Sequence, residues 1–334
     1  MNAKTLLNII SPILNLRYDI TWKGLDCLEG QGPFLLLPNH PAEIDPLLLL
    51  VGLWPKLKIR PVLLSNFHRN PIIGCYTRAV RAIPLPDLEN NQDASAVSEV
   101  QQAIDNICQA LSEGDNILLY PSGRLMRGGL EKLMGASSAF QIITKVKHVK
   151  VRLIKTRGLY GSLSSTAPKQ GERPHPIVFG IKAFFLLLRY GVWFMPRRQV
   201  SISIEPASND LLRADTKQKF NDLLEARFNQ DGPEIPASNI IKLSTDAAAT
   251  SKSKAEDSRA FNPEVWGIIK DKLSELSGLE AEKIEASFSL REDLALDSIQ
   301  LIELAHWLKD EFNCRTPRIR HLKTAASLYD IALR

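Results

Sequence analysis

The stretch that decides the fold is residues 34–50, FLLLPNHPAEIDPLLLL, in which polar residues interrupt two runs of leucine. Residues 34–37 are a short apolar run typical of a buried strand. The prolines that follow predict a turn, and Asp45 before a proline predicts the start of a helix that the aspartate caps. Asn39 and His40 then lie where a strand ends. In isolation, this pattern is also typical of ordinary turn chemistry.

The first 260 residues alternate β-rich runs with helical stretches, which predicts an α/β sheet with helices packed on it. Residues 94–113 have helical apolar spacing and lead to Gly114, a residue suited to a helix C-cap. The strands are expected at residues 18–22, 33–38, 60–65, 81–85, 116–121, 149–154 and 200–205.

Composition narrows the class of protein. The 334 residues are 44% hydrophobic and 24% charged, as in an ordinary globular protein, and their number suits about two domains. The four cysteines are scattered without metal-type spacing, so no metal is expected. Because no cleavable signal is recognised either, we expect a reducing, cytoplasmic location.

Charge is distributed unevenly along the chain. Residues 261–334 hold 10 Lys and Arg against 13 Asp and Glu, and residues 1–260 hold 32 against 24. The first part is therefore basic and the last acidic, which suits an anionic lipid, an acidic substrate or nucleic acid as partner of the first part. No helix-turn-helix, zinc-finger or aromatic RNA-binding pattern is found, so we expect no nucleic-acid partner.

A change of composition divides the chain. Residues 237–260 lose aromatic residues and periodicity, which indicates a flexible linker with an r.m.s. span of about 27 Å. After it, residues 262–278, 297–312 and 324–333 have the spacing of amphipathic helices, which predicts a small all-α bundle. The expected domains are therefore residues 1–236 and 261–334.

Two apolar stretches suggest membrane contact. Residues 5–16 are too short to span a bilayer, and residues 176–196 carry Lys182 and Arg189 on one helical face. That pattern is typical of an interfacial helix whose cations reach lipid head groups, although a buried core helix has the same periodicity. We expect peripheral contact with the inner face of the cell membrane.

A second polar motif follows another apolar run, in residues 118–125, LLYPSGRL. The ordered pair of motifs, Asn-His-x-x-x-x-Asp and Tyr-Pro-Ser-Gly-Arg, resembles the glycerophospholipid acyltransferase family over roughly residues 15–210. This resemblance implies a mixed, largely parallel sheet flanked by helices and the acylation of a lysophospholipid or glycerol phosphate. It also implies that His40 is the base that deprotonates the acceptor hydroxyl, a role suited to an imidazole at neutral pH. Asp45 would hold the opposite imidazole nitrogen.

The same resemblance implies the substrate-binding residues Asn39, Ser122, Gly123 and Arg124. The glycine would let backbone approach the acceptor, and the arginine would offer a planar fork to a phosphate. Ser122 stands where the family usually has a glutamate, which favours an acceptor other than plain glycerol phosphate. The family often has an arginine after its second strand motif, where this chain has Pro86, and Arg81 and Arg78 are possible substitutes.

The C-terminal residues carry their own signal. Residues 262–334, and above all Leu296-Asp297-Ser298-Ile299, resemble the acyl and peptidyl carrier protein family. This resemblance implies a 4′-phosphopantetheine arm on Ser298, installed by a phosphopantetheinyl transferase and charged by an acyl-loading enzyme. Asp297 would cap the helix that Ser298 begins, so that the phosphodiester would lie at the positive end of the helix dipole.

The two resemblances together indicate a phospholipid-biosynthesis enzyme of the 1-acylglycerol-3-phosphate acyltransferase type. It would move an acyl chain from a thioester donor, either its own carrier or acyl-CoA, to a lipid alcohol such as a lysophospholipid. Two alternatives remain open. In one, the carrier serves a different assembly line; in the other, the chain is a docking protein with an inert acyltransferase body.

Overall fold

We describe a computed structural model in which residues 2–30, 32–69, 73–86, 94–167, 197–236, 261–291 and 293–333 are placed. The chain divides into two compact units. The first comprises Met1–Leu85, Gln102–Leu133 and Ser138–Lys242, and the second comprises Pro86–Gln101, Met134–Ser137 and Leu243–Arg334. The predicted interfacial helix at residues 176–196 and the predicted linker at 237–260 lie outside the described residues.

The first unit is built on a seven-stranded sheet of order β1-β7-β6-β2-β5-β3-β4. Every neighbouring pair is parallel except β6 and β7, which are antiparallel. The predicted mixed, largely parallel sheet is confirmed. Its strands are β1 (Tyr18–Lys23), β2 (Phe34–Pro38), β3 (Arg60–Leu64), β4 (Ile83–Leu85), β5 (Ile117–Leu118), β6 (Lys150–Arg157) and β7 (Arg198–Pro206).

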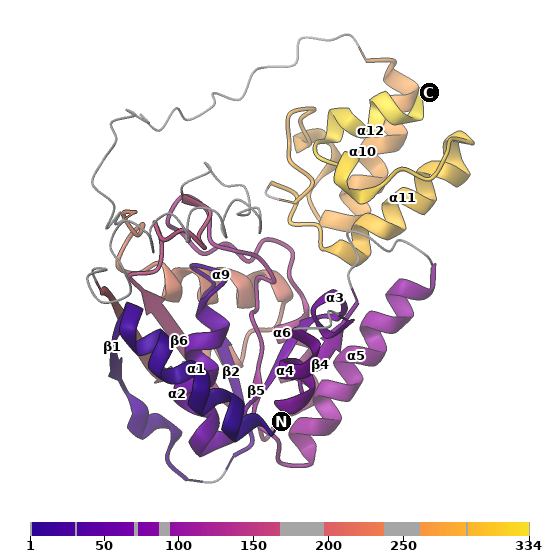
Figure 1. The fold of residues 1–334 in the computed structure, drawn as a ribbon. Helices are drawn as coiled ribbons and strands as arrows, with labels where there is room; N and C mark the ends of the chain where they lie inside the picture. Colours follow the sequence, from indigo (N-terminus) through magenta and orange to yellow (C-terminus); the bar gives the residue numbers. More distant parts are fainter. Residues whose placement is uncertain are drawn as a thin grey trace. The chain divides into compact units, whose positions relative to one another are not determined.

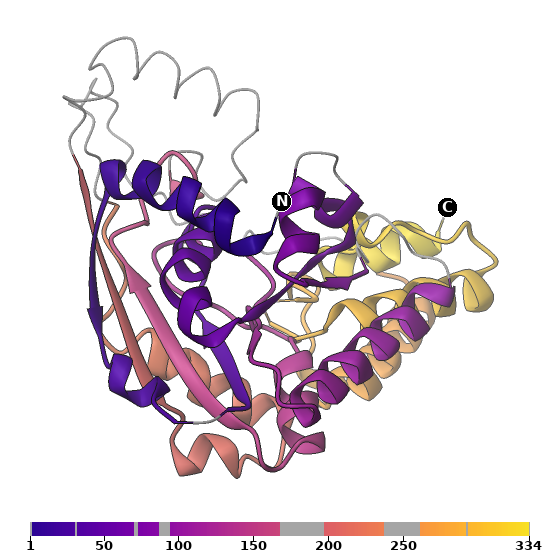
Figure 2. The same ribbon diagram turned by 60° about the horizontal axis from the view of Figure 1, so that its bottom comes forward.

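Helices cover both faces of this sheet (Figure 1). They are α1 (Ala3–Arg17), α2 (Asp45–Leu57), α3 (Ser65–Arg69), α4 (Ile73–Ala79), α5 (Ala94–Ser112), α6 (Ser138–Lys145), α8 (Asn209–Leu212) and α9 (Lys217–Phe228). Figure 2 shows α1 and α2 on one side, where their leucines join residues of β1, β2 and β7 in one apolar cluster. On the other side, α6 and α9 meet through the rings of Phe140 and Phe220, whose centroids are 5.8 Å apart.

β2 is the central element of this core. All five of its residues are buried, because a strand covered on both faces cannot alternate apolar and polar residues. At its first residue, Asn116 Oδ1 accepts a hydrogen bond from Phe34 N at 2.9 Å, while Asn116 Nδ2 donates to Leu57 O at 2.7 Å. One side chain therefore joins the starts of β2 and β5 to the end of α2.

The second unit contains a helical bundle formed by α10 (Pro263–Ser277), α11 (Ser298–Phe312) and α12 (Ala325–Ala332). These are the three helices that the apolar spacing predicts. Their buried faces share one cluster of leucine, isoleucine and alanine side chains. Each helix begins with a side-chain cap, from Asn262, Asp297 and Thr324 respectively.

Helix α1 has an unusual outer face. Ile9 and Ile13, one helical turn apart, are 54% and 62% exposed, and Lys4 and Arg17 lie toward the two ends of the helix. Among the helices that the structure describes, none is both long and apolar enough to cross a bilayer. Ile9 and Ile13 therefore form an exposed apolar surface on α1.

Replacing Asn116 with alanine should lower the free energy of unfolding of the first unit by about 2–4 kcal/mol, because two buried backbone groups lose their partner. Urea unfolding of the full chain measures this change, and the unfolding of the helical bundle of the second unit should not change. Gln109→Ala is the matched control, because that amide bonds only an exposed neighbour one turn away. A loss for Asn116→Ala no larger than for the control would contradict this account.

Candidate active site

The candidate site forms where β2, β5 and β6 end together. β2 pairs in parallel with both neighbours, with Leu36 opposite Leu118 and Pro38 opposite Ile154. The carboxyl ends of parallel strands meet at one edge of a sheet. His40 follows β2 and Tyr120 follows β5 by two residues each, so both lie at this edge.

Tyr120 joins the two predicted catalytic residues. Its ring packs on the imidazole of His40, with the ring centroids 4.2 Å apart and the planes tilted by 38°. Its hydroxyl donates a hydrogen bond to Asp45 Oδ2 at 2.7 Å. Tyr120 belongs to the Tyr-Pro-Ser-Gly-Arg motif, but its contact with His40 could not be predicted from the sequence, because only the alignment of β2 and β5 brings the two residues together.

Asp45 differs from expectation in two ways. The residue at the N-cap of α2 is Ile44, and no side chain caps this helix, so the predicted cap by Asp45 is wrong. The Asp45 carboxylate also points at the end of β5, where its Oδ2 accepts a hydrogen bond from the Tyr120 hydroxyl that the sequence did not predict. The hydrogen bond expected between His40 and Asp45 stays a prediction. The other carboxylate oxygen of Asp45, Oδ1, is buried and accepts no hydrogen bond from the residues that the structure describes.

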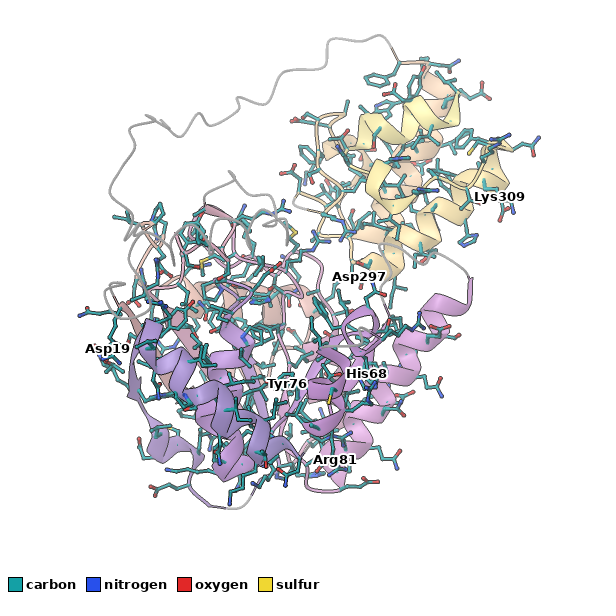
Figure 3. All side chains as sticks on the ribbon, in the orientation of Figure 1. Asp19, His68, Tyr76, Arg81, Asp297 and Lys309 are labelled. Atoms are coloured by element: carbon teal, nitrogen blue, oxygen red, sulfur yellow. The ribbon has the colours of Figure 1, made fainter. Side chains whose placement is uncertain are left out.

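Burial changes the acidity of this cluster. Asp45 has no exposed surface, and its desolvation raises its pKa to about 7, although the Tyr120 hydroxyl opposes the rise. Burial also raises the pKa of Tyr120 well above its ordinary value, with the charge of Asp45 adding to the effect. Tyr76 of α4, marked in Figure 3, raises the pKa of Tyr120 as well and has a buried hydroxyl. Near neutral pH, Asp45 is therefore poised between its two protonation states.

A second acid, Glu131, lies in the same region. It is 1% exposed, and its Oε2 accepts a hydrogen bond from the backbone N–H of His40 at 2.9 Å. Burial, with a smaller contribution from the charge of Asp45, raises its pKa to about 7. No motif in the sequence points to Glu131, which lies nine residues after Ser122.

Asn39 ties the end of β2 to β6. Its Nδ2 donates to Thr156 O at 3.0 Å, and its Oδ1 accepts from Thr156 N at 2.7 Å. Both ends of the amide thus bind backbone, which holds the turn before His40 in place. The substrate-binding role expected for Asn39 stays a prediction.

The predicted phosphate-binding residues follow Tyr120 in a tight turn. Ser122 is 8% exposed and donates to Arg124 O at 3.0 Å, so its hydroxyl closes this turn. Gly123 is exposed with φ of 60°, and a Cβ there would meet no described atom within 4 Å. Arg124 is half-buried beside it. The substrate-binding roles expected for these three residues stay predictions.

Arg81, one suggested substitute for the family's second arginine, lies at the wrong edge of the sheet. It precedes β4, and β4, β3 and β5 are parallel, so Arg81 is near the amino ends of the strands whereas His40 is at the carboxyl ends. It pairs there with Asp115 at 3.6 Å (Figure 3). The suggestion is therefore wrong.

Ser298 begins α11 in the carrier bundle. Asp297, marked in Figure 3, accepts a hydrogen bond from Gln300 N at 2.8 Å, and Gln300 Oε1 accepts one from Asp297 N at 3.0 Å. This capping box confirms the predicted cap. Arg291 Nη1 donates to Ser298 Oγ at 3.4 Å, so a cation lies beside the hydroxyl. A partly exposed serine at a helix N-terminus, next to an arginine, fits a phosphodiester on its oxygen.

Comparisons with known proteins agree with this division. Residues 19–154 match the family model described as acyltransferase, and residues 268–332 match the model described as phosphopantetheine attachment site. An acyl carrier protein of Saccharopolyspora erythraea is 33% identical over 72 residues, which are 21% of this chain and 76% of that protein. The C-terminal domain belongs to the acyl carrier protein family, and an acyltransferase domain precedes it.

Among solved structures, the crystal structure of the 1-acyl-sn-glycerophosphate acyltransferase PlsC from Thermotoga maritima is similar to this chain. The TM-score is 0.45 at 16% sequence identity, over 69% of this chain and 79% of that one. The acyl carrier domain implies a 4′-phosphopantetheine group, which Ser298, Asp297 and Arg291 are placed to hold.

Asp45→Asn should stabilise the acyltransferase domain, and increasingly so at higher pH. An aspartate titrates near 4 when unfolded and at about 7 in this site, so its favourable contribution is complete below pH 4 and is lost as the pH rises through 7. Asparagine has no such loss. The gain in free energy of unfolding should grow between pH 5 and pH 8, reaching about 1–3 kcal/mol.

Urea unfolding of the full chain at both pH values measures this gain. Asp19→Asn, at an exposed position of β1 (Figure 3), controls for the loss of one carboxylate. A gain that is constant or shrinks with rising pH would show that Asp45 does not titrate as its burial requires.

Proposed function

We propose that this chain is an O-acyltransferase that moves an acyl chain from its own carrier domain to a hydroxyl group of a lipid acceptor such as a lysophospholipid. The observation that carries the proposal is the cluster of buried Asp45 with half-buried His40 and Tyr120 at the edge of the sheet, in a chain that also holds a carrier domain. When bound, the phosphopantetheine group supplies a thiol that carries the acyl group as a reactive thioester.

His40 is the proposed general base. A lipid hydroxyl becomes a strong nucleophile only when its proton is removed as the bond forms. The imidazole takes that proton, and the ionised Asp45 carboxylate stabilises the positive charge through the cluster that Tyr120 holds together. The proton then returns to the leaving sulfur, which restores the neutral imidazole.

Arg124 and Gly123 are the proposed binding residues for the acceptor. The guanidinium of Arg124 pairs with a phosphate, and the exposed backbone at Gly123 lets the head group approach closely. The Ser122 hydroxyl closes the turn, so this residue shapes the site. The positive charge that pairs with the phosphate comes from Arg124. Asn39 supports the same site by fixing the turn that carries His40.

Delivery from the same chain is favoured by where the acyltransferase domain ends. Glu234 N donates to Gly129 O at 2.8 Å, and Glu234 Oε1 accepts from Gly158 N at 2.6 Å. The expected tether, residues 237–260, thus begins beside the loop that also contains Glu131. A flexible tether of this length keeps the carrier at about millimolar effective concentration, so a weak docking contact is enough.

Contact with a membrane surface belongs to the same proposal. The exposed Ile9 and Ile13 of α1 offer an apolar face, and the exposed Lys4 offers a cation to anionic head groups. We place the enzyme in the cytoplasm, at the inner face of the cell membrane.

The transfer itself tests the proposal. A phosphopantetheinyl transferase loads the full chain with a radiolabelled acyl group from acyl-CoA, and vesicles containing a lysophospholipid are added after the CoA is removed. Label should move to the lipid fraction in the wild-type protein. His40→Ala should slow this transfer by about 10²–10⁴-fold, because the alcohol loses its base.

Ser298→Ala distinguishes the carrier domain from free acyl-CoA as the acyl donor. This variant cannot carry the phosphopantetheine group, so transfer of label from the chain should cease. If its activity with free acyl-CoA equals that of the wild type, acyl-CoA is the donor. Equal transfer in wild type and His40→Ala would refute the catalytic assignment. A wild-type chain that keeps its label would favour a docking protein instead.

Tyr120→Phe should shift the acid limb of the activity profile to higher pH. Asp45 must be ionised to stabilise the imidazolium, and the Tyr120 hydroxyl opposes the rise of the Asp45 pKa, so its removal raises that pKa above about 7. The midpoint of the acid limb, measured as transfer rate against pH, should move up by about half a pH unit or more. An unchanged midpoint with a lower rate would mean that Tyr120 only packs against His40.

A further inference from the structure

Glu131 is the least expected group near the site. It lies between β5 and α6, in a segment without regular structure, and yet it is 1% exposed. A buried carboxylate costs folding free energy unless it is fully paired, and the rise of its pKa to about 7 reflects that cost. Titratable groups with strongly shifted pKa values are found preferentially at functional sites.

The side chain of Glu131 holds the backbone of His40. Its Oε2 accepts the His40 N–H at 2.9 Å, and Met126 N, from the same loop, donates to His40 O at 2.7 Å. His40 lies in a segment that is neither helix nor strand. These two hydrogen bonds therefore clamp His40 from both sides of its own main chain, and the position of the imidazole against Tyr120 follows from them.

Glu131 is itself held at both of its main-chain groups. Its N–H donates to Asn229 Oδ1 at 2.9 Å, and its C=O accepts from Asn229 Nδ2 at 2.7 Å. Asn229 follows the last residue of α9. The carboxyl is thus aimed at His40 by a side chain from a rigid helix end, as a precise site requires.

The Glu131 carboxyl also interacts with the hydroxyl of Ser122, which opposes the rise of its pKa. Ser122 is the position at which the acyltransferase motif resembled by this chain has a glutamate. At this position the chain has a serine hydroxyl that faces the carboxyl of Glu131, nine residues further along the chain.

We propose that Glu131 is the positioning residue of His40, and that it supplies from the loop the carboxyl that this chain lacks at position 122. The proposal rests on the proposed function of His40 as base. Glu131 exchanges no proton with the substrates; it fixes where the imidazole stands. A displacement of about 1 Å at a catalytic group can cost about 10²-fold in rate.

The experiment compares Glu131 variants of the full, acyl-loaded chain in the transfer assay. Glu131→Ala should lower the rate constant of transfer by about 10- to 100-fold and leave the KM for the lipid acceptor unchanged. Glu131→Gln keeps an oxygen that can accept the His40 N–H, and it should retain the rate within about threefold. Adding Ser122→Glu to Glu131→Ala should restore most of the lost rate, because a carboxyl returns to the same space.

Glu225→Ala is the matched control. Its carboxyl accepts a hydrogen bond from Leu133 N of the same loop, so this variant loosens the loop without removing the bond to His40. It should lower the melting temperature about as much as Glu131→Ala does, and leave the transfer rate within about threefold. An equal loss of rate in both variants would reduce Glu131 to general support of the loop and overturn the proposal.

Hydrogen–deuterium exchange of the His40 amide provides a readout that does not depend on activity. The amide should exchange slowly in the wild type and in Glu131→Gln, and at least about tenfold faster in Glu131→Ala. Unchanged exchange, or an Ala variant that transfers label at the wild-type rate, would overturn the proposal. If no variant transfers label but exchange changes as expected, the proposed function fails while the positioning role stands.

Discussion

The parallel pairing of β2 with β5 and β6 is the constraint on which the rest of this structure depends. It brings the ends of three strands to one edge of the sheet, and so places the residues after β2 against those after β5. The ring of Tyr120 then lies on His40 and its hydroxyl on Asp45. A shift of β5 by one residue would turn Tyr120 to the other face and away from both His40 and Asp45.

The carboxyl edge of the sheet, where His40 lies, contains two buried acidic residues. Asp45 and Glu131 are at most 1% exposed, and each pKa rises to about 7 because water no longer solvates the charge. Apolar residues at these two positions would avoid the desolvation cost that a buried carboxylate adds to the free energy of folding. This cost arises next to His40, whereas the buried residues of β2, β6 and β7 are mostly leucine, isoleucine and valine. We interpret the contrast as stability given up for a prepared catalytic site.

Much of the fold could be predicted, because local pattern carries it. Each of the seven predicted β-rich runs is a strand, and the apolar spacing after residue 261 predicts α10, α11 and α12 within two residues at each end. The capping box at Asp297 was predictable for the same reason, since its members are three residues apart. The expected cap by Asp45 failed because the carboxylate had a second possible partner, Tyr120, 75 residues away.

The rest of the site could not be predicted because it depends on distant contacts. Nothing in the residues around Glu131 indicates burial, and its link to His40 spans 91 positions. Arg81 was misplaced for the converse reason: its sequence position suggested the site, but the direction of β4 carries it to the opposite edge.

The last residues of the acyltransferase domain, up to residue 236, support the loop next to His40. Glu234 binds the backbone at Gly129 and Gly158, and Asn229 binds the backbone of Glu131, so the last residues before the expected tether support the loop that clamps His40. Residues 229–236 therefore belong to the acyltransferase fold, and a domain cut before Asn229 would lose the support of the loop that clamps His40. The same few hydrogen bonds hold His40, the proposed base, and the residues that precede the expected tether.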